Sequence, residues 1–237
     1  MIAPKVLVVQ NHADGGARRV GEWLTESGLR LDVVHGPEQS PPEDGDHDAV
    51  LVLGGGFMPD DDARAPWLKA TRAIVAKALE DGTPVLGICL GGQLLAHVAG
   101  GTVEADVGAP ETGSVPIRIR PDAQGDRLFD GLPPVVTAIE HHIDAVTRLP
   151  EGATWLAETD LCPYQAFRVG EFAWGTQFHP EVSPESLLTW DAGKLAEKGH
   201  DRAELYESAV DAEPLAGPVW RTVVGRFAEL VRERAAA

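Results

Sequence analysis

The chain has 237 residues and a formal net charge of −17, from 20 Lys and Arg against 37 Asp and Glu. An acidic surface repels phosphate backbones and anionic lipids, which argues against nucleic acid or a membrane as the main partner. No apolar run approaches the length of a membrane span, and the N-terminus lacks the features of a secretory signal. Two cysteines, Cys89 and Cys162, are too few for a disulfide framework. We therefore expect a soluble, cytoplasmic protein.

Strands and helices are expected to alternate over the first hundred residues. Some short apolar runs are typical of strands buried on both faces, namely 5–11, 31–35, 49–56 and 84–88. Other segments have the apolar spacing of helices, namely 15–27, 66–82 and 92–100. The polar, Pro-rich segment 36–48 is typical of a loop with a solvated acidic surface. The alternation predicts an α/β fold with a mostly parallel sheet and helices on both faces.

The pattern changes after residue 101. Short β-like runs separated by turns, between about 102 and 178, predict an antiparallel extension of the sheet. Residues 183–237 predict a helical C-terminus, with breaks near Gly199–His200 and at Pro214–Pro218. Because the sequence has no clear linker, repeat or low-complexity segment, we expect one domain over 1–237, with its core at about 5–183.

One cysteine occupies a position suited to catalysis. The run "GICLGG" places Cys89 at the carboxyl end of a predicted parallel strand, where open α/β sheets bind their ligands. Glycines permit the strained turn that exposes a nucleophile, and a following helix N-terminus favours the thiolate. A buried structural cysteine explains this motif equally well.

A base and a group that orients it are found in "FHPE". His179 and Glu181 are two residues apart, so in extended backbone they share a side, and Glu181 is placed to hold the imidazole toward Cys89. An ordinary surface His and Glu is the alternative for this motif alone. The turn "LGGG" (53–56) ends a neighbouring strand, and its N–H groups, with the amide of Leu90, are candidate oxyanion donors.

Five motifs together resemble those of the class I (triad-type) glutamine amidotransferases, and most closely the stand-alone subfamily similar to the glutaminase domain of GMP synthase. They are "LGGGFMPDD", "GICLGGQLLA", "HHIDAVTRLPEG", "CPYQAF" and "GTQFHPEV". The resemblance extends over roughly residues 5–183. It implies a flavodoxin-like class I amidotransferase fold and no metal or other cofactor.

The resemblance also implies roles for individual residues. Cys89, His179 and Glu181 would form the triad, in which Cys89 attacks the side-chain amide of L-glutamine and forms a γ-glutamyl thioester. The oxyanion donors implied are Gly55 and Leu90. The substrate-binding residues implied are Gln93, Gly56, His141 and His142.

Within "HHID", His142 and Asp144 fit a family segment whose backbone binds the amino-acid end of glutamine. Adjacent histidines in a strand point to opposite faces, which favours a structural role over a metal site. Cys162 matches no catalytic position and is expected to be structural.

Two departures from the family leave the reaction open. Gly92 replaces the histidine of the common "CLGHQ", which would remove bulk near the mouth of the site, and no synthase domain follows by residue 237. The favoured interpretation is a glutaminase that delivers ammonia to an unidentified synthase partner. A γ-glutamyl hydrolase or transferase acting on other γ-glutamyl compounds is the alternative, and a non-catalytic binding module is less favoured.

Overall fold

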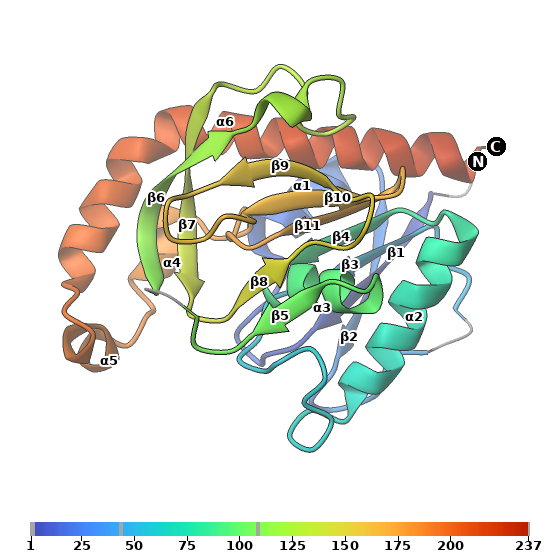
Figure 1. Ribbon diagram of the computed structural model, residues 1–237, viewed down its shortest axis with the longest axis horizontal. Coiled ribbons are helices and arrows are strands. Elements are labelled where there is room, and N and C mark those ends of the chain that lie inside the picture. The colour runs from blue at the N-terminus through green and yellow to red at the C-terminus, as the bar shows by residue number, and fades with distance from the viewer. Residues whose placement is uncertain (1–2, 43–44, 108–109, 237) are drawn as a thin grey trace.

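The structure is a computed structural model that describes residues 3–42, 45–107 and 110–236. Its main sheet has nine strands in the order β2-β1-β3-β4-β11-β10-β9-β6-β7 (Figure 1). Strands β2, β1, β3, β4 and β11 run parallel to one another, and the rest are antiparallel. This mixed sheet with helices on both faces confirms the predicted α/β class.

The elements of the parallel half match the predicted alternation. Their bounds are β1 Lys5–Gln10, α1 Arg18–Glu26, β2 Arg30–His35, β3 Ala49–Val52, α2 Trp67–Asp81, β4 Val85–Ile88 and α3 Leu90–Val98. Helix α2 ends at Gly82, whose left-handed φ of 66° suits a residue without a side chain. Helix α3 begins two residues earlier than predicted, directly after Cys89.

Both faces of the parallel half are buried, which explains its continuous apolar strands. In β1, Val6 and Val8 pack into the core that includes α1 and the C-terminal helix. Leu7 and Val9 pack into the opposite core, with α2 and α3. The alternation of side chains along a strand therefore supplies two apolar layers from one short sequence.

The second half contributes the antiparallel strands and also β11, which is parallel to β4 and antiparallel to β10. Their bounds are β5 Thr102–Glu104, β6 Glu111–Ile119, β7 Val135–His142, β8 Ala145–Arg148, β9 Thr154–Glu158, β10 Ala166–Val169 and β11 Ala173–Thr176, with a 3₁₀ turn at Pro121–Ala123. Strands β5 and β8 pair only with each other among the described residues, as a separate two-stranded sheet. The predicted extension is thus correct for the main sheet but missed this small second one.

The C-terminal segment forms α4 Pro184–Leu187, α5 Ala192–Glu197 and α6 Arg202–Ala235. The predicted break near Gly199–His200 is confirmed, but the break at Pro214–Pro218 is wrong, because α6 is continuous through both prolines. Both prolines are exposed, so water can satisfy the carbonyls that lose their N–H partners. The helix bends instead of ending (Figure 1).

Two further features bear on the sequence predictions. The loop predicted at 36–48 includes residues 43–44, which lie outside the described residues, and most of its other side chains are exposed. In the part of the chain that the structure describes, no helix combines the length and the apolar character needed to cross a membrane.

Candidate active site

Cys89 occupies a strained turn between β4 and α3. Its backbone has φ 52° and ψ −110°, a conformation that residues with a side chain rarely adopt. The turn is held because the Cys89 N–H donates to the Thr176 carbonyl at 2.7 Å, and the Cys89 carbonyl accepts from Gln93 N–H at 2.9 Å. The predicted strand–turn–helix elbow is therefore present, with the strain concentrated at the cysteine.

The glycines after Cys89 let α3 approach the sheet closely. A Cβ added at Gly91 would lie 2.0 Å from the Val52 carbonyl oxygen, and one at Gly92 would lie 2.6 Å from the Thr176 carbonyl oxygen. This corrects the expectation that Gly92 opens the mouth of the site. The missing side chain of Gly92 faces the helix–sheet interface, and Gly92 itself is buried.

His179 and Glu181 interact, but across a turn and not along the extended backbone that the sequence predicted: residues 180–181 form a turn in which the Val182 N–H donates to the His179 carbonyl at 3.2 Å. The His179 Nδ1 atom lies 2.7 Å from Glu181 Oε1, and both side chains are largely buried. The backbone holds this segment in place, since the His179 N–H donates to the Ile139 carbonyl of β7 at 2.8 Å. From α1, Arg19 Nε donates to the Pro180 carbonyl at 2.8 Å.

The charge state of His179 is set by its neighbours. Burial lowers the pKa of His179, but the Glu181 carboxylate and Cys89 together outweigh that effect and hold the pKa well above its ordinary value. The Nε2 atom of His179 is buried and has no hydrogen-bond partner of ordinary geometry among the described residues. Cys89 nevertheless lies close enough to raise the pKa of His179. An imidazolium beside the Cys89 sulfur is thus the favoured state.

Cys89 and His179 meet at the floor of a cavity of about 730 Å³. The lining comprises His12, Asp14, Gly15, Arg18, Gly54, Gly55, Gly56, Cys89, His141, His179, Glu181, Val182, Thr189, Trp190, Asp191, Lys194, Leu195, Glu197 and Lys198. A Cβ added at Gly54 would lie 3.0 Å from His179 Cε1 and 3.5 Å from Cys89 Cβ, so this glycine leaves space between the two side chains.

The predicted site residues divide into two groups. Gly55, Gly56 and His141 line the cavity with Cys89, His179 and Glu181. Within the described structure, Leu90, Gln93 and His142 lie outside the lining. Leu90 and Gln93 belong to the first turns of α3, where both are buried. His142 points away from His141, as expected for adjacent residues in a strand.

Gln93 belongs to a relay of side-chain amides that ends at the cysteine. Its Nε2 atom donates to the Asp144 carbonyl at 2.9 Å and to Gln177 Oε1 at 3.1 Å. The Gln177 Nε2 atom in turn donates to the Cys89 sulfur at 3.5 Å. Sequence reasoning missed Gln177, although its position two residues before His179 has the same spacing that identified Glu181.

Asn11 is a second residue that sequence reasoning missed. It follows β1 directly and is fully buried, and its Nδ2 atom donates to the Leu53 carbonyl at 2.7 Å. Its Oδ1 atom accepts from Trp67 Nε1 at 2.9 Å. Because Leu53 immediately precedes the glycine turn 54–56, Asn11 fixes the start of that turn. A buried Asn at the carboxyl end of a strand was the available signal.

A buried polar cluster lies behind β7, on the side opposite His141. His142 Nε2 lies 3.1 Å from Glu111 Oε2, which also accepts from Gln165 Nε2 at 2.8 Å. Glu111, His142 and Cys162 bring candidate metal-ligand atoms within 4.8 Å of one another. Hydrogen bonds already account for the Glu111 and His142 contacts, and burial first, then the nearby carboxylates, raises the pKa of the Cys162 thiol. These features favour a neutral structural thiol.

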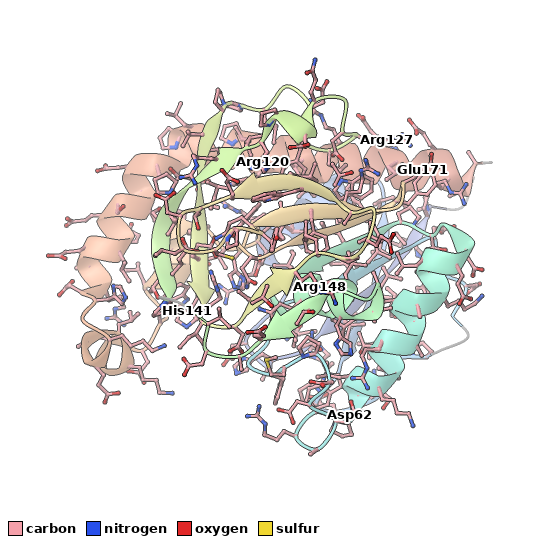
Figure 2. The ribbon with its side chains drawn as sticks, viewed as in Figure 1. Asp62, Arg120, Arg127, His141, Arg148 and Glu171 are labelled. Carbon is pink, nitrogen blue, oxygen red and sulfur yellow. The ribbon has the colours of Figure 1, made fainter. Side chains whose placement is uncertain are left out.

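His141 faces the cavity at the end of β7, on the side of the molecule where α5 lies (Figure 2). Its ring contacts Trp190 with centroids 4.5 Å apart and planes at 60°. Although His141 keeps an exposed side, desolvation by the residues around it, followed by the positive charges of His179 and Lys198, lowers its pKa to about 4. The ring is therefore neutral at physiological pH, and it presents an aromatic surface to the cavity.

A family model described as "Glutamine amidotransferase class-I" matches residues 9–188, which include the elbow, the glycine turn and the His179–Glu181 pair. The chain belongs to the class-I glutamine amidotransferases. The amidotransferase is 35% identical to one subunit of the glutamine-hydrolysing GMP synthase of Archaeoglobus fulgidus, over 75% of this chain and 89% of that protein. It is 31% identical to the GMP synthase of Streptomyces avermitilis, over 76% of this chain but only 33% of that protein.

Solved structures agree with this assignment. A glutamine amidotransferase from Thermotoga maritima superposes on the amidotransferase with a TM-score of 0.85 and 26% identity, over 95% of this chain and 98% of that one. A protein from Methylobacillus flagellatus, solved as a glutamine amidotransferase, has a TM-score of 0.84 over 96% of this chain and 95% of its own. At 23% identity it supports the fold alone.

Proposed function

We propose that this chain hydrolyses the side-chain amide of L-glutamine through a γ-glutamyl thioester on Cys89 and delivers the ammonia to a separate synthase chain. The observation that carries the proposal is the meeting, in one cavity, of a cysteine on a strained elbow and a histidine held by a buried carboxylate. Nucleophile, base and orienting group are the parts that acyl transfer through a thioester requires.

The first half of the proposed reaction forms the thioester. The Cys89 sulfur bonds to the amide carbon of glutamine, and the resulting oxyanion is stabilised by the amides of Gly55 and Leu90. His179, whose raised pKa favours the imidazolium, gives its Nε2 proton to the amide nitrogen. The carbon–nitrogen bond then breaks, and ammonia leaves.

The second half returns the enzyme to its starting state. Neutral His179 accepts a proton from water, and the oxygen of that water attacks the thioester carbon. The carbon–sulfur bond breaks, glutamate is released, and the thiolate–imidazolium pair is restored. Glu181 holds Nδ1 throughout, so that Nε2 keeps facing the reacting atoms.

The separate synthase is proposed from two facts. The Archaeoglobus relative, of which this chain covers 89%, is by name one subunit of a GMP synthase, and the Streptomyces relative is about three times as long as the matched region. The first fact suggests an arrangement in which glutaminase and synthase are different chains. We also propose that 1–237 forms one domain.

The test is glutamine turnover by the purified chain and its variants. We expect slow hydrolysis that rises when the cognate synthase is added, and a γ-glutamyl adduct on Cys89 in the intact mass. His179→Ala should reduce kcat by about 10²-fold or more through loss of acid–base catalysis. Glu181→Gln should retain more activity, because an amide still orients the ring without stabilising the imidazolium.

A matched control for these variants is His97→Ala, because His97 is exposed at the far end of α3 and does not line the cavity. Wild-type turnover by His179→Ala, or an adduct on Cys162 in place of Cys89, would overturn the proposed chemistry. Unchanged turnover in the presence of the synthase would overturn the proposed delivery of ammonia.

A further inference from the structure

The outer wall of the cavity comes from a part of the chain that the family model does not match. The match ends at residue 188, whereas Thr189, Trp190, Asp191, Lys194, Leu195, Glu197 and Lys198 line the cavity. These residues belong to α5 and its flanking turns. The floor around Cys89 thus comes from the family core, and the wall facing it is supplied by a segment outside that core.

The cavity is large for glutamine. Its volume of about 730 Å³ lies well within the range of roughly 300–1,000 Å³ that accommodates drug-sized ligands. A γ-glutamyl group on Cys89 fills only the part nearest the floor. The remaining space is lined by residues of α5 and of the β1–α1 loop, and it is available to a group bonded to the γ-glutamyl carbon.

Part of the outer wall is apolar and aromatic. Trp190 is packed edge-on against His141, whose ring is neutral because its pKa is lowered to about 4. Val182 belongs to the same apolar cluster as Trp190, and Leu195 is a further buried residue of the lining. This surface suits an apolar or aromatic side chain, because burial against it removes apolar area from water.

The same wall carries two ammonium groups. Lys194 and Lys198 are four residues apart, so they lie on one side of α5, and neither forms an ion pair among the described residues. Arg18 lines the cavity from the β1–α1 loop. The acidic residues of the lining are Asp14, Asp191, Glu197 and Glu181, but Asp191 caps α5 and Glu181 holds His179. Within 189–198 the two lysines are balanced by Asp191 and Glu197, so in a chain of net charge −17 this wall is locally neutral and its two ammonium groups are available to a carboxylate.

We propose that the outer wall binds the leaving-group half of a γ-glutamyl peptide, an apolar amino acid with a free carboxylate. This inference rests on the proposed thioester chemistry. The sulfur–carbon bond forms as the peptide carbon–nitrogen bond breaks, and the His179 proton goes to the α-nitrogen of the departing amino acid. Water then releases glutamate from Cys89, as it does after attack on glutamine.

The experiment compares kcat/KM for glutamine, γ-glutamylphenylalanine and the same dipeptide with its C-terminal carboxylate converted to an amide. We expect the free acid to exceed both of the others by about tenfold, which corresponds to about 1.4 kcal/mol of transition-state preference. Replacing phenylalanine by glycine in the dipeptide substrate should remove the part of the kcat/KM preference that comes from contact with Trp190.

Variants locate the effect on the wall. In Lys194→Ala/Lys198→Ala, the ratio of kcat/KM for γ-glutamylphenylalanine to that for glutamine should fall about tenfold. The matched control is Lys69→Ala/Lys77→Ala, which removes the same charge from exposed positions of α2 outside the cavity lining. That control should leave the ratio within about twofold of the wild-type value, because salt screens exposed charges that do not line the cavity.

The outcomes separate this inference from the proposed function. In one outcome glutamine forms the Cys89 adduct and turns over, but γ-glutamylphenylalanine has no kcat/KM advantage over glutamine, or retains that advantage in Lys194→Ala/Lys198→Ala. This outcome overturns the peptide site and leaves the glutaminase proposal standing. If the wild-type chain forms no adduct with any of these substrates, both proposals fail.

Discussion

The two thiols of this chain differ because their surroundings differ. Cys89 lines the cavity beside His179, whereas Cys162 is only 1% exposed, and burial raises the pKa of its thiol. We expect iodoacetamide to alkylate Cys89 at least about tenfold faster than Cys162, because the thiolate is the reactive form. Peptide mass spectrometry over a time course measures both rates. In guanidinium chloride the rates should converge, and equal rates in the folded protein would contradict the assignment of Cys89.

The side-chain amide of Gln177 tests what supports the Cys89 sulfur. Its Nε2 atom donates to that sulfur, while its Oε1 atom accepts from Gln93. Gln177→Leu should slow both alkylation and glutamine turnover by roughly 10- to 100-fold, since a hydrogen bond to a charged group contributes about 1.5–3 kcal/mol.

Gln177→Glu separates a role at the sulfur from a role in packing. A glutamate keeps the acceptor for Gln93 but turns a carboxylate oxygen toward the sulfur, so it should repel a thiolate. Alkylation should therefore be slower in Gln177→Glu than in Gln177→Leu. The reverse order would mean that Gln177 serves only to hold Gln93.

At the scale of elements, α6 supports the site from behind. Trp220 is only 1% exposed, donates from Nε1 to the Thr137 carbonyl of β7 at 2.8 Å, and contacts the ring of Phe178 with centroids 4.5 Å apart. Phe178 immediately precedes His179. The helix that continues through two prolines therefore packs directly against the strand and turn that position the candidate base.

Removing this contact should destabilise the protein strongly. We expect Trp220→Ala to lower the free energy of unfolding by about 3–5 kcal/mol, as for other large-to-small substitutions in a core. Urea unfolding followed by circular dichroism measures the change. Leu215→Ala is the control on the same helix: Leu215 is 81% exposed, so its loss should cost no more than about 0.5 kcal/mol. Equal effects of the two substitutions would contradict this packing role.

At the scale of the whole molecule, one buried acid should govern part of the pH dependence of stability. Glu140 is fully buried, neither of its carboxylate oxygens has a hydrogen-bond partner in the described structure, and His142 Nε2 lies 3.7 Å from its Oε2 atom. Burial, followed by the charge of Glu111, raises the pKa of Glu140 well above its ordinary value of 4.5. The folded state thus retains a proton that the unfolded state has already released.

The sign of the effect follows from this difference in bound protons. Below pH 4.5 Glu140 is protonated in both states and does not change the free energy of unfolding. From pH 4.5 upward only the unfolded state releases this proton, so the free energy of unfolding falls until the pH passes the pKa of the folded state. Glu140→Gln stays neutral, so we expect it to be more stable than wild type at pH 7 and to lose that advantage toward pH 4.5. Urea unfolding at both pH values measures this. Exposed Glu171 (Figure 2) provides the control, Glu171→Gln, and a pH-independent difference for Glu140→Gln would contradict the prediction.

The sequence by itself determined the features whose residues lie close together in the chain. The apolar strands of the parallel half and the pairing of His179 with Glu181 involve residues within a few positions of one another, whereas the turn around Cys89 also needs Thr176, whose carbonyl accepts from the Cys89 N–H. Dihedral preferences and the alternation of side chains act over that range. The family resemblance, carried by the same short motifs, was confirmed, whereas the catalytic roles of these residues stay predictions.

Tertiary structure alone decided the features that join distant segments. Helix α6 continues through Pro214 and Pro218 because its buried residues pack against the core, which outweighs the local preference to break. The relay from Gln93 to Gln177 connects residues 84 positions apart, and the wall formed by α5 lies opposite Cys89 only because the chain returns to that edge of the sheet. Such contacts produce no periodic pattern in the sequence of either segment, because the two side chains come together only when the chain has folded.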